Sequence, residues 1–594
     1  AIDEAAIQFR MLNRSKGPAV WAPRAQADRA AYSRALLGLL ERARSIDIIE
    51  GSAEEVLVDE GRGEDTPRDT DRLESRSEGR SQMNGDRQGE CSYSEADRER
   101  RRSYSEENLH GGRSRGQCVR GVRLGDGRVL HAAAVILTTG TFLRGLMHCG
   151  PKKTEGGRLG ERAAVGLSAS LSALGFEVGR LKTGTPPRVH RDSIDYDACQ
   201  AQPGDEIPTP FSFMNDAIHR PQVDCWITYT NEQAHKHILA NLDRAPLYSG
   251  QISSTGPRYC PSIEDKVVRF SDKPRHQVFL EPEGYDNERV YCNGISTSLP
   301  VDVQQAMVHS IPALERAEIL QYGYAIEYDW VPTHQTQCTL ESKLVRGLFF
   351  AGQINGTSGY EEAGAQGLVA AVNAVHSMNG KEPLILGREV AYIGVLIDDL
   401  ITKPPVEPYR MFTSRAEYRL QLRSDNADQR LTAIGRELGL VDDQRWQRFE
   451  RKMAALEVIR GVCDRGAIDG VPLSTWMRRP EATVARFAEG PGVQDAGPFG
   501  ADDLWQVLVD AKYSGYLTRQ SLQIQRLRRL ESLEIPDRLD YARIPELRLE
   551  AQERLARLAP RTLGQASRIS GINPADITVL WVHITGRGRL RSAS

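Results

Sequence analysis

The first residues that could do chemistry lie in a loop bounded by prolines. Residues 256–266 read Gly-Pro-Arg-Tyr-Cys-Pro-Ser-Ile-Glu-Asp-Lys, which places a thiol, two cations and two carboxylates close together. Cations such as Arg258 and Lys266 lower the pKa of a nearby thiol, so Cys260 is a candidate nucleophile or acid. Surface loops without a function have the same composition, and the spacing alone leaves both interpretations open.

A second pattern combines a buried strand, a glycine-rich turn and a helix. Residues 348–351 are an apolar run, a turn with three glycines follows over 352–359, and residues 361–378 carry apolar side chains at helical spacing. Glycines let the backbone approach a ligand, and the free N–H groups of a helix N-terminus attract an anion or a flavin ring. A β–α turn without a ligand is the alternative.

Another strand of this kind is predicted at residues 134–140, an apolar run that ends in Thr-Thr-Gly. Such a run is typical of a buried parallel strand that ends at a binding crevice. The dinucleotide fingerprint G-x-G-x-x-G and the Walker A motif are absent. Because the chain begins at Ala1 as if within a domain, we expect that an N-terminal piece is missing.

Two further clusters could bind metal, but structural roles are favoured for both. His235 and His237 would not share a helix face, which argues against a zinc pair. The pair Asp398 and Asp399 lacks further ligands, so it is expected to cap a helix or to form ion pairs. No metal site is predicted.

The C-terminal residues 511–594 are basic, with 15 Lys and Arg against 8 Asp and Glu. Residues 566–577 predict a helix, a turn at Gly571, an Asn cap and a new helix that begins with Pro. Such a hairpin offers N–H groups to a nucleic-acid phosphate, and Arg561 and Arg568 lie near it. A solvated helical face is the alternative interpretation.

Composition limits the class of protein. The 594 residues are 40% hydrophobic and 26% charged, which predicts several globular domains. The net charge of −3 excludes a positive electrostatic potential over the whole chain that would attract nucleic acid. No run of about 18 apolar residues is present, which excludes a membrane-spanning helix. Nine cysteines without a C-x-x-C pair exclude a disulfide scaffold.

Local patterns also predict individual elements. A helix is predicted within residues 18–44, two short strands over 46–58 around Gly51, and a hairpin over 119–130 with an Asp-Gly turn. Between them, 25 of the 55 residues in segment 61–115 are charged and only seven are apolar, so this segment is predicted to be a disordered insertion.

Four stretches together resemble one known family. They are residues 180–188 (Arg-Leu-Lys-Thr-Gly-Thr-Pro-Pro-Arg), the loop 256–266, the turn extended to 359–363 (Gly-Tyr-Glu-Glu-Ala), and residues 407–415 (Glu-Pro-Tyr-Arg-Met-Phe-Thr-Ser-Arg). Their sequence and order are similar to the tRNA uridine 5-carboxymethylaminomethyl modification enzymes of the GidA/MnmG family. The segment with Trp21 is more similar to the organellar form, which suggests a mitochondrial location, with the cytoplasm or a plastid as alternatives.

The resemblance implies an α/β fold in four parts. Its core is a Rossmann-like, two-dinucleotide-binding FAD domain, with an inserted α/β domain and a helical C-terminal domain. The implied boundaries are 1–150 for the first part of the FAD lobe, 151–330 for the inserted NAD or substrate domain, 331–405 for the rest of the FAD lobe, and 406–594 for the helical tRNA- and partner-binding domain.

The resemblance also implies site residues. Gln353, Gly352, Gly359, Ala53 and Ala164 correspond to flavin contacts, although the family has Val and Ser where this chain has the two alanines. Cys260 corresponds to a catalytic cysteine. The implied nicotinamide-binding segment consists of Gly256, Pro257, Arg258, Tyr259, Cys260, Pro261, Ser262, Ile263, Glu264, Asp265, Lys266, Val267, Val268, Arg269 and Phe270. Without the glycine fingerprint, the chain as written is expected to bind FAD weakly or not at all, whereas a chain extended upstream with that fingerprint is expected to bind it well.

The implied reaction modifies carbon five of the wobble uridine in tRNA with FAD, NADH and methylene-tetrahydrofolate. The implied partners are tRNA, a GTPase of the MnmE/TrmE type and a second copy in a homodimer, and no membrane. Glycine and taurine are both possible donors. Two alternatives remain: a folate- and FAD-dependent tRNA uracil methyltransferase, and a non-catalytic tRNA- and GTPase-binding homologue that has lost FAD.

Overall fold

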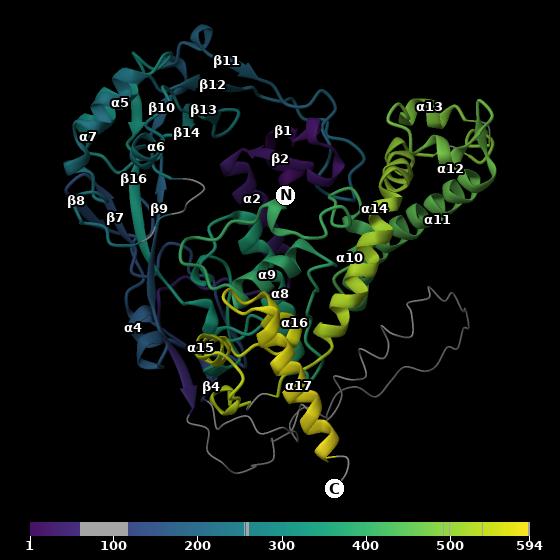
Figure 1. Ribbon diagram of the computed structural model, residues 1–594. Helices are drawn as coiled ribbons and strands as arrows, with labels where there is room; N and C mark the ends of the chain where they lie inside the picture. Colours follow the sequence, from purple (N-terminus) through teal and green to yellow (C-terminus); the bar gives the residue numbers. More distant parts are fainter. Residues whose placement is uncertain are drawn as a thin grey trace.

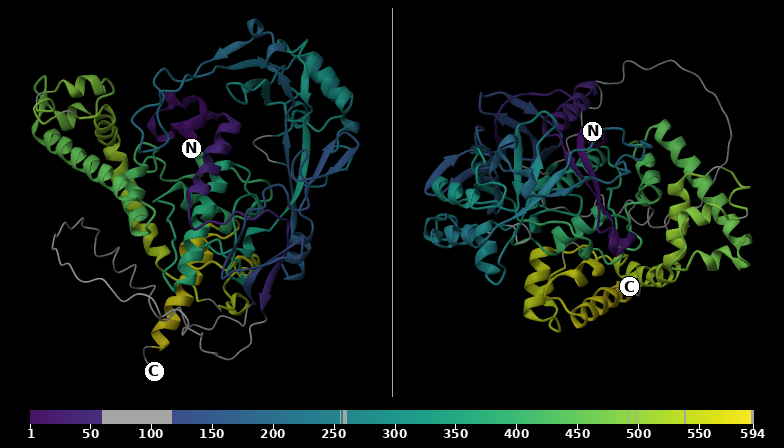
Figure 2. Two further views of the ribbon diagram at one scale, coloured as in Figure 1. Left: turned by 180° about the vertical axis from the view of Figure 1, so that it is seen from behind. Right: turned by 90° about the horizontal axis from the view of Figure 1, so that it is seen from above.

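The computed structural model describes residues 1–59, 117–254, 256, 261–490, 492–497, 499–536 and 539–591 (Figure 1). The predicted insertion at 61–115 lies outside the described residues. No helix in the described part of the chain has the length and apolar character needed to cross a membrane. Figure 2 shows a central α/β region, a β-rich domain beside it and a helical arm that projects away from both.

The central region is built from short strands that share an apolar core. One sheet has the order β17-β4-β3 with β5 beside β4, and β18 pairs with β6 in parallel. Helices α4 and α8 pack against these strands, and Val56, Leu137 and Phe350 lie in the shared core. The bounds are β3 Ala53–Asp59, β4 Gln117–Leu124, β5 Val129–His131, β6 Val135–Leu137, β17 Val345–Arg346, β18 Leu348–Phe350, α4 Gly166–Ala173 and α8 Tyr360–Met378.

Most of the predicted local elements are confirmed here. The hairpin is β4 and β5, the two apolar runs are β6 and β18, and the helix after the glycine turn is α8. The prediction of two strands over 46–58 is wrong for its first half. Only β3 forms, and Ile48 is 62% exposed. A strand needs a neighbour to pair its N–H and C=O groups, and no described strand lies beside residues 46–50.

The N-terminal segment packs away from the central core. Strands β1 (Ala6–Leu12) and β2 (Ala22–Ala27) form a hairpin, preceded by α1 (Ile2–Ala5) and followed by α2 (Arg29–Arg42). The Gln8 amide donates to the carbonyls of Gln202 and Val223, each at 2.9 Å. Residues 1–27 are therefore attached to the inserted domain.

The inserted domain contains a six-stranded sheet with the order β11-β12-β13-β14-β10-β15, in which neighbouring strands are antiparallel. Three helices pack on it around a buried aliphatic core. The bounds are β10 Arg188–His190, β11 Gln200–Gln202, β12 Cys225–Tyr229, β13 Gln277–Pro282, β14 Arg289–Asn293, β15 Ile319–Gln321, α5 Glu232–Leu239, α6 Ile263–Arg269 and α7 Val301–His309.

A four-stranded sheet joins this domain to the central region. Its order is β8-β7-β16-β9, with bounds β7 Leu146–Cys149, β8 Lys152–Glu155, β9 Gly179–Thr185 and β16 Tyr324–Trp330. β9 and β16 pair over seven residues and run together from the centre to the inserted domain (Figure 1). This pair fixes how the two parts face each other.

The rest of the chain is helical. α9 lies against the central region, α10 to α14 form the arm, and α15 to α17 form a small bundle at its base (Figure 1). Asn573 caps α17 as predicted, because its side chain accepts from the Asp576 N–H at 3.0 Å. The bounds are α9 Tyr392–Thr402, α10 Ala427–Glu437, α11 Asp443–Arg465, α12 Leu473–Trp476, α13 Val484–Ala488, α14 Ala501–Glu531, α15 Leu549–Leu558, α16 Leu563–Arg568 and α17 Pro574–Arg591, with the two-residue strands β19 Ala467–Ile468 and β20 Val471–Pro472.

Candidate functional site

The parallel strands β6 and β18 end side by side, and each is followed by a glycine turn. Gly140 has φ +57° and Gly352 has φ +84°, values that favour glycine over residues with a Cβ. The carboxyl ends of adjacent parallel strands are the usual place for a dinucleotide in an open α/β sheet. The two predicted strand ends therefore lie side by side, at the edge where a dinucleotide would bind, and this edge with its two glycine turns is called the crevice.

Gln353 lies at the centre of this crevice. It belongs to a short 3₁₀ turn over Gly352–Asn355, and its Oε1 would be 3.5 Å from a Cβ built on Gly140. The turn is held from below by Gln366 of α8, which accepts from the Gly352 N–H at 3.2 Å and from the Asn355 amide at 3.1 Å. A buried amide network of this kind fixes the turn rigidly.

Ala164 borders the loop that follows β6, and Ala53 lies next to it. The Ala164 carbonyl accepts from Arg144 at 2.8 Å, and Gly166 donates to the Glu54 carboxylate at 2.9 Å. Gly359 lies farther along, as the N-cap of α8, where a Cβ would be 1.8 Å from the Glu362 carboxylate. A side chain at position 359 would therefore require the Glu362 carboxylate to shift.

The crevice fits the flavin that the resemblance implies. Two positive-φ glycines leave a cradle without side chains, and two buried polar atoms next to it, Thr139 Oγ1 and Asn355 Oδ1, have no hydrogen-bond partner within the described structure. Unpartnered buried polar atoms are rare in folded proteins, so a polar ligand is the natural partner for them. Gly352, Gln353 and Gly140 would hold the group.

The predicted nicotinamide segment is only partly available to a ligand. Pro257, Arg258, Tyr259 and Cys260 lie outside the described residues. Ser262 caps α6, and the Lys266 ammonium donates to the Gly294 carbonyl at 2.7 Å. Ile263 and Val267 are 0% and 3% exposed in the core of the inserted domain, so the structure corrects their assignment as cofactor contacts.

The remaining members of that segment divide between buried and exposed positions. Glu264 accepts from the Thr297 hydroxyl at 2.9 Å, and Asp265 accepts from the Tyr248 hydroxyl at 3.1 Å. Both contacts hold α6 to neighbouring segments. Val268 and Phe270 are 38% and 45% exposed, and Arg269 is also exposed.

Sequence reasoning missed a buried polar network on the connecting sheet. Glu327 of β16 binds His148 Nε2 at 2.9 Å and the Ser254 hydroxyl at 2.7 Å, and the Gln251 amide nitrogen lies 2.9 Å from His148 Nδ1. Burial raises the pKa of Glu327, but the hydrogen bonds from His148 and Ser254 outweigh it and lower that pKa below its ordinary value. These residues are far apart in the sequence. The pairing of β7 with β16 brings His148 close to Glu327, and the segment with Gln251 and Ser254 reaches both through hydrogen bonds.

Lys182, the strand partner of Glu327, was also missed as a site residue. It is 4% exposed, although it lies within the motif 180–188 that carried the family resemblance. β9 also contains Arg180 and two threonines, so its composition did not single out Lys182.

Arg568 occupies a different position from the one predicted. Its guanidinium donates to both oxygens of Asp398 at 2.7 Å and also binds Glu531, so it joins the bundle to α9 and α14. Burial lowers the pKa of Arg568, but these carboxylates outweigh it and raise that pKa above its ordinary value. The predicted contact of Arg568 with a phosphate is therefore corrected, because its guanidinium forms ion pairs with Asp398 and Glu531.

Arg561 is half-buried at the same junction, where its guanidinium lies 3.8 Å from Cys338 Sγ. Asp398 and Asp399 form the expected ion pairs, with Arg388 at 3.0 and 2.8 Å. His235 binds the Thr230 hydroxyl at 2.8 Å and contacts the His276 ring. Within the residues described, no group of three metal-ligating side chains is found.

An α/β core with a glycine crevice, an inserted domain and a helical end define a multidomain nucleotide-binding enzyme. Comparison with known families agrees. The model described as glucose inhibited division protein A matches residues 1–382. The C-terminal helical domain and helical bundle of the tRNA modifying enzyme MnmG/GidA match residues 443–521 and 523–594.

Individual proteins are similar over almost the whole chain. The tRNA uridine 5-carboxymethylaminomethyl modification enzyme MnmG of Rhodopirellula baltica is 48% identical, over 98% of this chain and 83% of its own length. The enzyme of that name from Protochlamydia amoebophila is 46% identical, with coverages of 98% and 85%. Aquifex aeolicus GidA in its form I crystal superposes with a TM-score of 0.82 at 40% identity, with coverages of 98% and 88%.

The chain belongs to the MnmG/GidA family of tRNA-modifying enzymes, which is FAD-dependent. The predicted fold class is confirmed by these matches.

Proposed function

We propose that the protein installs an aminomethyl-type side chain, carboxymethylaminomethyl or taurinomethyl, on carbon 5 of the wobble uridine of tRNA. It would use FAD, NADH and methylene-tetrahydrofolate and act with a GTPase of the MnmE/TrmE type. The crevice at Gly140, Gly352 and Gln353 carries the proposal, because it provides a flavin site in a chain whose MnmG relatives match it nearly end to end.

The chain's own residues have definable tasks in this reaction. FAD, when bound, would supply the redox and one-carbon chemistry that amino-acid side chains cannot perform. Gln353 and the turn braced by Gln366 would orient it, and the unpartnered Thr139 hydroxyl would donate or accept one hydrogen bond. The inserted domain, held rigidly by β9 and β16, would present the reductant and the small substrates from the other side.

Cys260 is proposed as the catalytic thiol. It lies four residues beyond Gly256, whose Cα is beside Lys182, and two residues before the cap of α6. The flanking residues Gly256 and Ser262 both lie near Lys182 of the connecting sheet, and the family resemblance supports the catalytic role of the cysteine between them.

The basic C-terminal part is proposed to bind tRNA and the GTPase, and the protein is proposed to act as a homodimer in a mitochondrion. The net excess of positive charge over residues 511–594 favours a phosphate-bearing partner. Arg568 is excluded from the contact set because Asp398 and Glu531 bind it.

The test is reconstitution with unmodified tRNA, FAD, NADH, methylene-tetrahydrofolate, the GTPase with GTP, and either glycine or taurine. Mass spectrometry of the digested nucleosides should show the uridine with the complete side chain, and omission of any component should abolish it. Cys260→Ser should abolish the product, whereas Cys199→Ser in the inserted domain should not.

The alternative functions give different results in the same assay. A methyl group gained without the GTPase would identify a uracil methyltransferase. Binding of tRNA without flavin absorbance or product would identify a non-catalytic homologue. Either result would contradict the proposal.

A further inference from the structure

Lys182 is a buried cation for which the described residues provide no counter-ion. Its side chain is 4% exposed in β9, and within the described part of the chain it forms no hydrogen bond or ion pair. Burial of an unpaired ammonium is costly, so such groups are rare unless they bind something.

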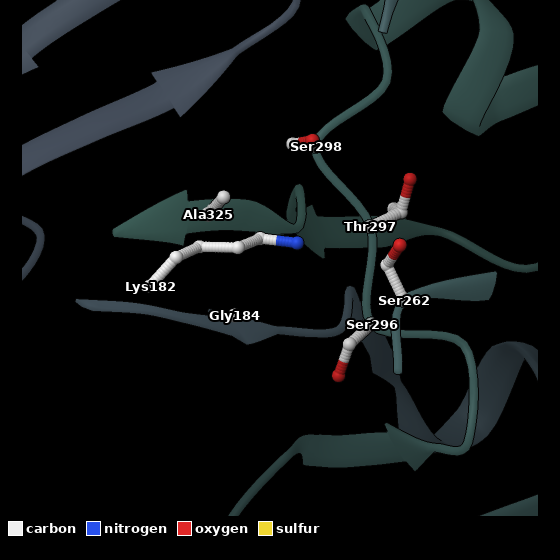
Figure 3. Close-up of a pocket in the computed structure, with 7 residues that line it drawn as sticks. All are labelled: Lys182, Gly184, Ser262, Ser296, Thr297, Ser298 and Ala325. Carbon is white, nitrogen blue, oxygen red and sulfur yellow. The ribbon is translucent and has the colours of Figure 1, made fainter. Parts of the chain in front are cut away.

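The Lys182 amine points at a cluster of hydroxyl groups, as Figure 3 shows. The hydroxyls come from Ser262, the cap of α6, and from the loop between β14 and α7. Together they line a cavity of about 10 Å³, which has room for about one water-sized group. The lining residues are Lys182, Gly184, Ser262, Ser296, Thr297, Ser298 and Ala325.

Two of these hydroxyls are free to act as donors. No hydrogen bond of the Ser296 or Ser298 side chain is present among the described residues, and the Ser262 hydroxyl makes only a long contact of 3.5 Å with the Asp265 N–H. The Thr297 hydroxyl donates to Glu264 at 2.9 Å and is already engaged.

Neither Glu264 nor Glu327 forms an ion pair with Lys182 within the described structure. Glu264 Oε1 accepts from the Thr297 hydroxyl and from the Ser298 N–H at 3.0 Å, and Glu264 Oε2 is buried without a hydrogen-bond partner among the described residues. Glu327 is the direct strand partner of Lys182, but its carboxylate forms hydrogen bonds with His148 and Ser254 instead. The Lys182 ammonium group therefore lines the cavity without an ion pair to a described carboxylate.

We propose that this cavity is an oxyanion subsite, in which Lys182 and the serine hydroxyls bind a carboxylate or phosphate oxygen of a small-molecule substrate. An ammonium beside O–H groups is complementary to an oxyanion, because each of these groups can donate a hydrogen bond to it. The inference rests on the proposed function, which supplies two sources of that group: the carboxylate of an amino-acid donor and a phosphate of NADH.

The space for this oxygen depends on two small residues on the same sheet face. Gly184 is paired with Ala325, and both lie on the face that carries Lys182, because side chains two residues apart on a strand point the same way. A Cβ on Gly184 would lie 3.6 Å from the Tyr324 carbonyl and 3.9 Å from Ser296 Cβ, which is ordinary contact. Gly184→Ala therefore reduces the cavity without a clash or a positive-φ conflict.

The experiment is equilibrium dialysis of the full chain with FAD present, using glycine, NADH and inorganic phosphate as separate probes. Lys182→Met removes the charge, Gly184→Ala fills the space, and Lys153→Met on the exposed strand β8 is the control for charge alone. We expect the dissociation constant of at least one probe to rise by about tenfold in Lys182→Met, to rise less in Gly184→Ala, and to stay unchanged in Lys153→Met.

A second measurement uses the chain without any substitution. In the unaltered chain, the bound probe should slow acetylation of Lys182, measured by peptide mass spectrometry, and leave acetylation of Lys153 unchanged. An effect of glycine alone assigns the site to a carboxylate, and effects of NADH and phosphate assign it to a nucleotide phosphate.

Unchanged binding of all three probes in both variants, together with no protection of Lys182, would overturn the subsite. Neither readout needs tRNA turnover. If binding of a probe depends on Lys182 but no modified tRNA forms, the proposed function is refuted and the subsite stands. If modified tRNA forms but no probe binding depends on Lys182, the subsite is refuted and the proposed function stands.

Discussion

A partly buried arginine and a buried lysine have opposite surroundings in this protein. Arg568, at the junction of the bundle with α9 and α14, is held by Asp398 and Glu531. Lys182, on the connecting sheet, faces hydroxyl groups and has no carboxylate partner in the described structure. A cation that forms ion pairs with carboxylates of other helices joins parts of the fold. A buried cation whose neighbours are only hydroxyl groups can bind an anion from outside the protein. The partners around a cation, more than its burial, therefore separate a structural role from a binding role.

The largest expected effect is on stability at the Arg568 junction. Arg568→Met would leave two partly buried carboxylates without their partner, and we expect a loss of about 3 kcal/mol of unfolding free energy. Urea denaturation measures it, with Arg543→Met as the control, because Arg543 is 83% exposed and makes only a short-range pair with Asp540. Unchanged stability combined with weaker tRNA binding would return Arg568 to the nucleic-acid surface.

The next effect concerns the buried carboxylate beside Lys182. Glu327→Gln removes the charge that binds His148 and Ser254, and should cost about 1–2 kcal/mol near neutral pH. Because the folded pKa of Glu327 lies below its ordinary 4.5, its contribution is fully present above that pH and is lost as pH falls through the folded value.

The difference in unfolding free energy between wild type and Glu327→Gln should therefore shrink on acidification below about pH 4.5. Denaturant titrations from pH 7 to pH 3 measure it. A difference that grows on acidification would contradict the assigned pKa direction.

A smaller effect of opposite sign is expected at Lys182 itself. Replacing an unpaired buried ammonium by an apolar chain of similar length should leave stability unchanged or raise it by about 1 kcal/mol. Thermal unfolding of Lys182→Met in the absence of ligands tests this against Lys153→Met. A clear loss of stability would mean that Lys182 is paired within the fold, and the contrast with Arg568 would disappear.

The smallest effect is expected from deletion of residues 61–115. Asp59 and Cys118 are paired across β3 and β4, so the deletion leaves a three-residue connection of Glu60, Gly116 and Gln117, which suits a hairpin. A shorter loop changes the closure free energy by only about 1 kcal/mol. A large fall in melting temperature would show that the segment contributes to the core.

Local patterns in the sequence were reliable where the structure is local. The glycine turn before α8, the hairpin at β4 and β5, and the Asn573 cap depend on residues within a few positions of each other, and all three form. The proposed strand at residues 46–50 does not form, because a strand depends on a neighbour that the local pattern does not contain.

The candidate site divides in the same way. Gln353 could be identified from its turn and from the family resemblance, and the crevice places it beside Gly140. Lys182 and Glu327 could not be identified as a pair, since 145 positions separate them and they meet only through the register of β9 and β16.

The sequence by itself determined the family, the glycine turns and the strongly charged segment, because these follow from residue type and short spacing. Only the tertiary structure decided which charges are satisfied. The carboxylates that bind Arg568 come from two other helices, 170 and 37 positions away, and the carboxylate opposite Lys182 is bound instead by His148 and Ser254. Charge pairing depends on distance in space, and spacing along the chain does not fix it.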